Sequence, residues 1–114
     1  MELSKKDKKT AREIINKGLQ IEYCTGLLEF DGILQHWKSN SLSDRDAYMQ
    51  LYDSVIKFDK HITRRYNDLR GSNYLMIVAS LLIDSIITEA DLENFSDDAK
   101  QAVLRWASLD KEYK

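Results

Sequence analysis

Apolar residues recur every three or four positions along the first half of the chain, which is the spacing of one face of a helix. A polar cluster at 39–43 interrupts this pattern and divides it into two long segments. The first apolar stripe consists of Ile15, Leu19, Tyr23, Gly26, Phe30, Ile33 and Trp37. The second consists of Tyr48, Leu51, Tyr52, Val55, Phe58, Ile62, Tyr66 and Leu69. The pattern therefore predicts two long amphipathic helices, over 5–38 and 44–70.

The segment 74–87 is apolar at almost every position and so lacks a polar face. A helix of this kind has to be surrounded by other helices or by lipid. It is shorter than the stretch of about 20 apolar residues that spans a bilayer, and Asp84 lies inside it. We therefore predict a buried central helix near 73–88, followed by a short helix at 89–95 and a last helix at 97–110.

Local signals mark where these helices begin. Ser4, Ser43 and Ser96 are suited to cap helix N-termini, and Thr88 with Asp91 forms a capping-box pattern. Proline is absent and the connections are only a few residues long, which favours antiparallel neighbours. The chain of 114 residues is therefore predicted to be one all-α domain over 1–114, an antiparallel up-and-down bundle of four to five helices.

Composition narrows the functional classes. The formal net charge of −2 gives no general affinity for nucleic acid or for anionic membranes. Cys24 is the only cysteine, and the N-terminus lacks the apolar segment of a secretory signal, so we expect a cytoplasmic protein with no membrane association. The basic run, Lys57 to Arg65, leaves contact with nucleic acid as an alternative. The flanking acids Asp53 and Asp68 disfavour that alternative.

Signatures of catalysis and metal binding are missing from the sequence. The chain has no glycine-rich phosphate loop and no Glu-x-x-His pair, and Cys24 has neither a base nor a cation beside it. Glu22, Glu29 and His36 follow one another at intervals of seven, which we interpret as a solvated helix face. We therefore expect no catalytic residue, no metal and no cofactor, and a protein that is not an enzyme.

Two acidic residues stand at positions that periodicity places among apolar neighbours. Asp59 lies in the second stripe, on the side of Tyr52 and Tyr66, and burial of a lone carboxylate is costly. Tyrosine hydroxyls or an arginine can satisfy it in the core; alternatively, Asp59, Tyr52, Tyr66 and Asp84 line an internal pocket that holds a small molecule or ion. Asp84 belongs either to the solvent line of its helix or to an ion pair with the basic run.

A second apolar line runs along the first long helix, about 100° or more from its main stripe. The line consists of Ile14, Gly18, Ile21, Thr25, Leu28 and Gly32. Small residues on such a line let another backbone approach closely, so the line either packs against the central helix or receives a partner helix. We predict the second role, as an interface for a protein partner or a second copy of the chain.

These features favour a small cytosolic helical-bundle protein without chemistry of its own. We predict a protein–protein interaction or adaptor module that can self-associate as a homodimer. The first alternative is a bundle that binds a small molecule or ion through the polar cluster around Asp59. The second alternative is a nucleic-acid accessory protein that uses the basic run.

Overall fold

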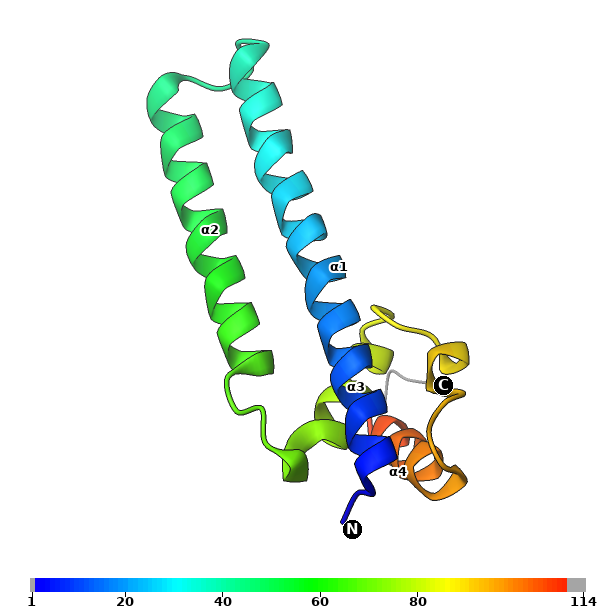
Figure 1. Ribbon diagram of the computed structural model, residues 1–114. Coiled ribbons are helices and arrows are strands. Elements are labelled where there is room, and N and C mark those ends of the chain that lie inside the picture. The colour runs from blue at the N-terminus through cyan, green and yellow to red at the C-terminus, as the bar shows by residue number, and fades with distance from the viewer. Residues whose placement is uncertain (1, 111–114) are drawn as a thin grey trace.

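The computed structural model describes residues 2–110, and these are helical with no strand (Figure 1). The four α-helices are α1 (Lys5–Lys38), α2 (Asp44–Tyr66), α3 (Tyr74–Ile83) and α4 (Asp97–Ser108). Two short 3₁₀ helices, η1 (Gly71–Asn73) and η2 (Glu89–Leu92), precede α3 and α4. The predicted all-α bundle of four to five helices is confirmed, with four α-helices over the described residues.

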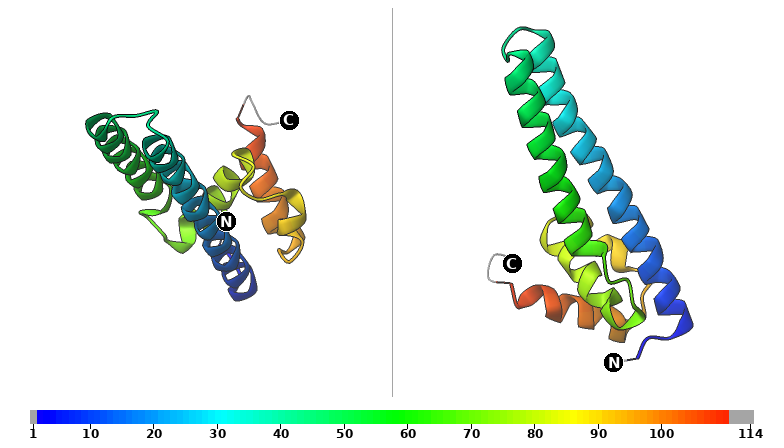
Figure 2. Two further views of the ribbon diagram at one scale, coloured as in Figure 1. Left: turned by 90° about the horizontal axis from the view of Figure 1, so that it is seen from above. Right: turned by 90° about the vertical axis from the view of Figure 1, so that its left-hand side faces the viewer.

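The helices are unequal in length, which gives the molecule two parts (Figures 1 and 2). The long helices α1 and α2 form an antiparallel hairpin, whereas α3 and α4 have only 10 and 12 residues and gather at the lower end of that hairpin. The molecule measures 54 × 27 × 20 Å as a result. We call the lower part the base and the projecting part of the hairpin, residues 23–58, the arm.

The starts of the α-helices follow the local signals in the sequence. The side chains of Ser4, Ser43 and Ser96 accept hydrogen bonds from backbone N–H groups three residues on, at 3.1, 3.1 and 3.3 Å. These bonds satisfy N–H groups that have no partner within the helix. At the tip of the arm, the Trp37 indole N–H donates to Asp44 at 2.7 Å and closes the turn between α1 and α2.

The ends of two helices rest on residues with positive φ. Asn40 after α1 has φ 64° and Ser85 after α3 has φ 58°. In each case the next residue's N–H returns to a carbonyl in the last turn: Ser41 to His36 at 2.8 Å and Ile86 to Leu81 at 2.9 Å. This is the Schellman arrangement, and at Ser85 it ends α3 five residues before the predicted end at 88.

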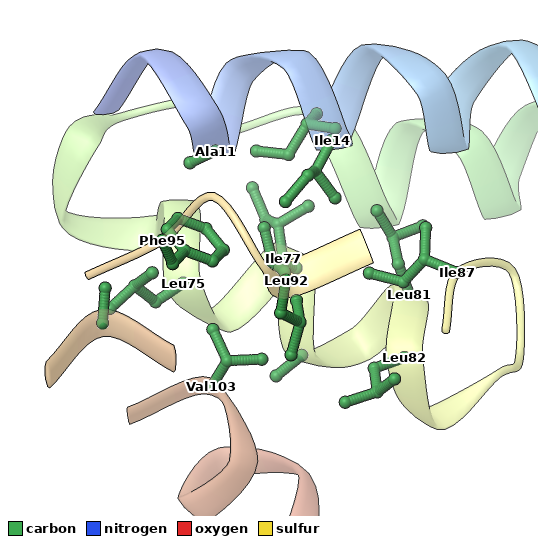
Figure 3. Close-up of a cluster of buried hydrophobic side chains, with 14 of the residues drawn as sticks. Ala11, Ile14, Leu75, Ile77, Leu81, Leu82, Ile87, Leu92, Phe95 and Val103 are labelled. Carbon is green, nitrogen blue, oxygen red and sulfur yellow. The ribbon is translucent and has the colours of Figure 1, made fainter. Parts of the chain in front are cut away.

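The core lies in the base, where α3 passes between α1 and α4 (Figure 3). Val78 and Leu81 of α3 and Val103 of α4 are fully buried, and Leu92 of η2 closes the same cluster. Gly18 of α1 lies directly over Leu81. The prediction of a buried helix in this segment is confirmed, although α3 is shorter than expected.

A buried carboxylate ties the N-terminus of α1 to that of α4. Asp7 is almost fully buried and accepts hydrogen bonds from the backbone N–H of Ser96 at 2.8 Å and its hydroxyl at 2.6 Å. Burial by itself raises the pKa of Asp7, but the bonds from Ser96 and Ser4 and the charge of Lys6 outweigh it. Together they hold this pKa below its ordinary value. The ionised carboxylate therefore joins the two ends of the base.

Replacing Asp7 by Asn should lower the free energy of unfolding at neutral pH by about 2 kcal/mol, the range for hydrogen bonds to a buried charge. The stabilisation from the carboxylate is fully present above its ordinary pKa of 3.8 and is lost as pH falls through the lowered pKa of the folded protein. Urea unfolding at neutral pH and near pH 3 should therefore show the gap between wild type and Asp7→Asn closing in acid. Glu13→Gln, an exposed change on the same helix, is the control. A gap that stays constant with pH would contradict this role of Asp7.

Candidate functional site

Glu22 of α1 is a buried charge on the side of this helix that faces α2, and it is only 5% exposed. Three groups from α2 converge on its carboxylate: His61 Nε2 lies 2.6 Å from Oε1, the Arg65 guanidinium donates at 3.2 Å and the Tyr66 hydroxyl at 2.5 Å. Burial and the adjacent Glu22 raise the pKa of the Tyr66 hydroxyl well above its usual range, so it keeps its proton and donates it. We call these four residues the Glu22 clamp.

The clamp extends to α3 through Arg65. The Arg65 side chain is nearly buried, and its second terminal nitrogen pairs with Asp84 directly after α3. Asp84 therefore combines the two roles considered for it, because it pairs with the basic run and stays in contact with solvent. Asp84 itself remains half exposed. The interpretation of Glu22 as part of a solvated face is wrong, because α2 covers this turn of α1.

Two depressions adjoin the clamp on the side of the hairpin where α3 lies. The larger, about 570 Å³, lies between α2 and α3, and the smaller, about 290 Å³, lies between α1 and α2. His61 lines both. The larger one contains acids as well as bases, since Asp68 and Asp84 line it together with Arg64 and Arg65. Neither depression therefore presents a single charge to a ligand.

The residues predicted to line an internal ligand pocket are dispersed. Tyr52 is exposed on the arm, Asp59 is exposed next to the root of the arm, Tyr66 is buried in the clamp, and Asp84 lies directly after α3. The expected burial of Asp59 is wrong because no residue within 2–110 covers this side of α2. The two depressions contain Asp84 but neither Asp59 nor Tyr52.

The predicted interface line on α1 is buried as far as α3 extends and exposed beyond it. Ile14 and Gly18 are buried against the base, so α3 occupies the place expected for a partner. Beyond them the line emerges on the arm. Ile21 is partly buried, Thr25 is exposed and bonds back to the Ile21 carbonyl, Leu28 is 67% exposed, and Gly32 has nothing within 4 Å of a Cβ position.

A different part of the arm carries the larger apolar surface, which we call the arm face. Its members are large side chains left between about two-fifths and two-thirds exposed: Tyr23 and Leu27 of α1, and Tyr48, Tyr52 and Val55 of α2. A helix rotates by about 100° per residue. The arm-face residues of each helix therefore point roughly 60–120° away from the side on which α1 and α2 contact each other. Because the helices are antiparallel, both sets turn to the same side. Gly18 on α1 turns the other way, so the arm face is opposite α3.

Aromatic contacts support the arm face from beneath. The rings of Tyr23 and Phe30 lie 6.4 and 5.8 Å from Phe58, which fills the space over Gly26. Tyr48 stacks on Tyr52 one turn later, with ring centroids 6.4 Å apart. Helical periodicity alone places most of these residues in the core stripes. The sequence signal for the arm face was Leu27, an apolar residue that lies beside the first stripe. The fold leaves its side chain exposed.

The basic run is paired with acids in part. His61 and Arg65 are paired with Glu22, and Asp68 lines the same depression as Arg64. Among residues 2–110 no group of three or more histidine, cysteine or acidic side chains is placed to hold a metal ion. Over the same residues, no helix has both the length and the apolar character needed to cross a membrane.

Comparison with known proteins gives no relative: no protein-family model, no curated protein and no solved structure matches this chain.

Proposed function

We propose that this protein is a non-catalytic interaction module that binds another protein through the arm face. The observation that carries the proposal is the gathering of five large apolar side chains on one uncovered side of a projecting hairpin. The largest contiguous apolar patch on a folded protein, typically about 300–600 Å², is often a functional surface. Tyrosine, which supplies three of the five side chains, is also enriched where binding energy is concentrated.

The Glu22 clamp supports this role by holding the arm at a fixed angle. Glu22, Arg65 and Asp84 link α1, α2 and the end of α3 in one network, so the arm is anchored at its root. A rigid binding surface loses less conformational entropy when a partner docks. The base therefore acts as a support, and the arm face makes the contact.

The test uses two adjacent leucines with nearly equal exposure. Leu27, 65% exposed, lies on the arm face, and Leu28, 67% exposed, lies about 100° further round α1 on the second apolar line. With a photoreactive phenylalanine analogue at position 52, irradiated cells should yield one discrete cross-linked species. Leu27→Asp should abolish that species, and Leu28→Asp should leave it.

Both substitutions should keep the melting temperature close to that of the parent, because exposed changes alter stability by about 0.5 kcal/mol or less. The proposal fails if position 52 gives no discrete product. It also fails if Leu28→Asp removes the product while Leu27→Asp does not, since the partner would then sit on the second apolar line.

A further inference from the structure

The outer border of the arm face on α2 carries a symmetric arrangement of charge. Arg45, Tyr52 and Asp59 follow one another at intervals of seven and therefore lie in one line along the helix. All three are exposed, and neither Arg45 nor Asp59 makes an ion pair with the rest of the chain over residues 2–110. A cation and an anion thus stand two turns to either side of a tyrosine.

We propose that the partner of the arm face is a second copy of this chain, with the two hairpins antiparallel and α2 packed against α2 about Tyr52. This inference rests on the proposed function. A two-fold axis through Tyr52 places Arg45 of each copy opposite Asp59 of the other. The same axis brings Tyr48 to within one residue of the level of Val55 in the other copy, so apolar residues meet inside the two ion pairs. Such a surface is complementary to itself, as a two-fold interface requires.

The charges also select the direction of pairing. With both tips pointing the same way, α2 of one copy would lie against α1 of the other. The Trp37–Asp44 hydrogen bond puts the tips of α1 and α2 at one level, so Arg45 would then meet Lys38. Like charges would face each other at the tip. The antiparallel arrangement replaces this repulsion by two attractions.

The available area suits a dimer of ordinary size. With roughly 200 Å² for each large side chain, the exposed fractions of the arm face and the neighbouring Trp37 amount to about 600 Å² on each copy. A stable interface buries about 800 Å² per partner. The bordering polar residues supply the remainder.

Charge reversal tests the pairing. Arg45→Asp leaves two acids on the border and Asp59→Arg leaves two bases, so each variant alone should repel itself. In sedimentation equilibrium at about 20 mM salt, each should raise the dissociation constant of the dimer about 10- to 30-fold. An equimolar mixture of the two should form a heterodimer. The double variant Arg45→Asp/Asp59→Arg should restore the homodimer to within about threefold of wild type.

The controls are Asp53→Arg and Lys60→Asp, which make the same charge changes on exposed parts of α2 away from this border. Both should sediment like wild type. Loss of the dimer in the two controls to the same extent would overturn the specific pairs. So would two single variants that do not recover when mixed.

The remaining outcomes separate this inference from the proposed function. A wild-type chain that is monomeric at about 0.1 mM overturns self-pairing, and the cross-link at position 52 then decides the proposed function on its own. A dimer that Leu27→Asp breaks, but that does not respond to charge reversal, keeps the arm face as the docking surface and overturns the antiparallel register. A dimer that survives Leu27→Asp places self-association elsewhere and overturns the inference.

Discussion

Replacing Glu22 by Ala is expected to lower the free energy of unfolding by about 3 kcal/mol, because the substitution leaves buried partners behind. Arg65 keeps only Asp84, and the Tyr66 hydroxyl loses the acceptor that lies 2.5 Å from it. A buried cation that loses one of its two acids and a buried donor left without a partner are each costly. Urea unfolding followed by circular dichroism measures the loss.

Two further variants define the origin of that loss. Glu29→Ala removes an exposed acid seven residues further along α1 and should change stability by about 0.5 kcal/mol or less. Glu22→Gln retains an acceptor for Tyr66 but not the charge, so its effect should fall between those of the two alanine variants. Equal effects of Glu22→Ala and Glu29→Ala would show that the clamp does not stabilise the fold.

At Glu22, helical periodicity does not predict whether the side chain is buried. The interval of seven that relates it to Glu29 and His36 is real, and the two later residues are exposed as expected. Glu22 differs because α2 and the end of α3 both reach this turn of α1. Which turn of a long helix is covered depends on where the other helices end, and that information lies far away in the sequence.

Helix starts were predictable, whereas helix ends were not. A start is set by a serine side chain and an N–H three residues on, so Ser4, Ser43 and Ser96 could be recognised locally. The end of α3 depends on Ser85 adopting a positive φ, which its residue type does not favour. Tertiary packing offers the reason, because the turn sends Ile87 back into the core.

The exposure of Asp59 has the same cause. Tyr48, Tyr52 and Val55 of the α2 stripe are exposed, because periodicity gives a direction and does not say whether a third helix covers it. Since α3 and α4 are short, the arm remains two helices thick. A residue predicted to be a buried carboxylate thus becomes part of an exposed border, and the arm face could be found only from the structure.

The second large effect is expected at Gly18. A Cβ atom there would stand 2.7 and 2.9 Å from the two terminal carbons of Leu81, which is fully buried and cannot move aside. Gly18→Leu should therefore overpack the contact between α1 and α3 and lower the free energy of unfolding by about 3 kcal/mol. The melting temperature should fall by about 10 °C.

Gly32 lies on the same line of α1 with nothing within 4 Å of its Cβ position, which makes Gly32→Leu a matched control. Leucine there should stabilise the helix by about 0.5–1 kcal/mol, because glycine is the poorer helix former. If Gly18→Leu lowers the free energy of unfolding and Gly32→Leu raises it, Gly18 packs against the protein's own central helix. A Gly18→Leu variant that folds normally yet loses the dimer would instead assign this part of α1 to the partner, and the packing of α1 on α3 would then have to be reconsidered.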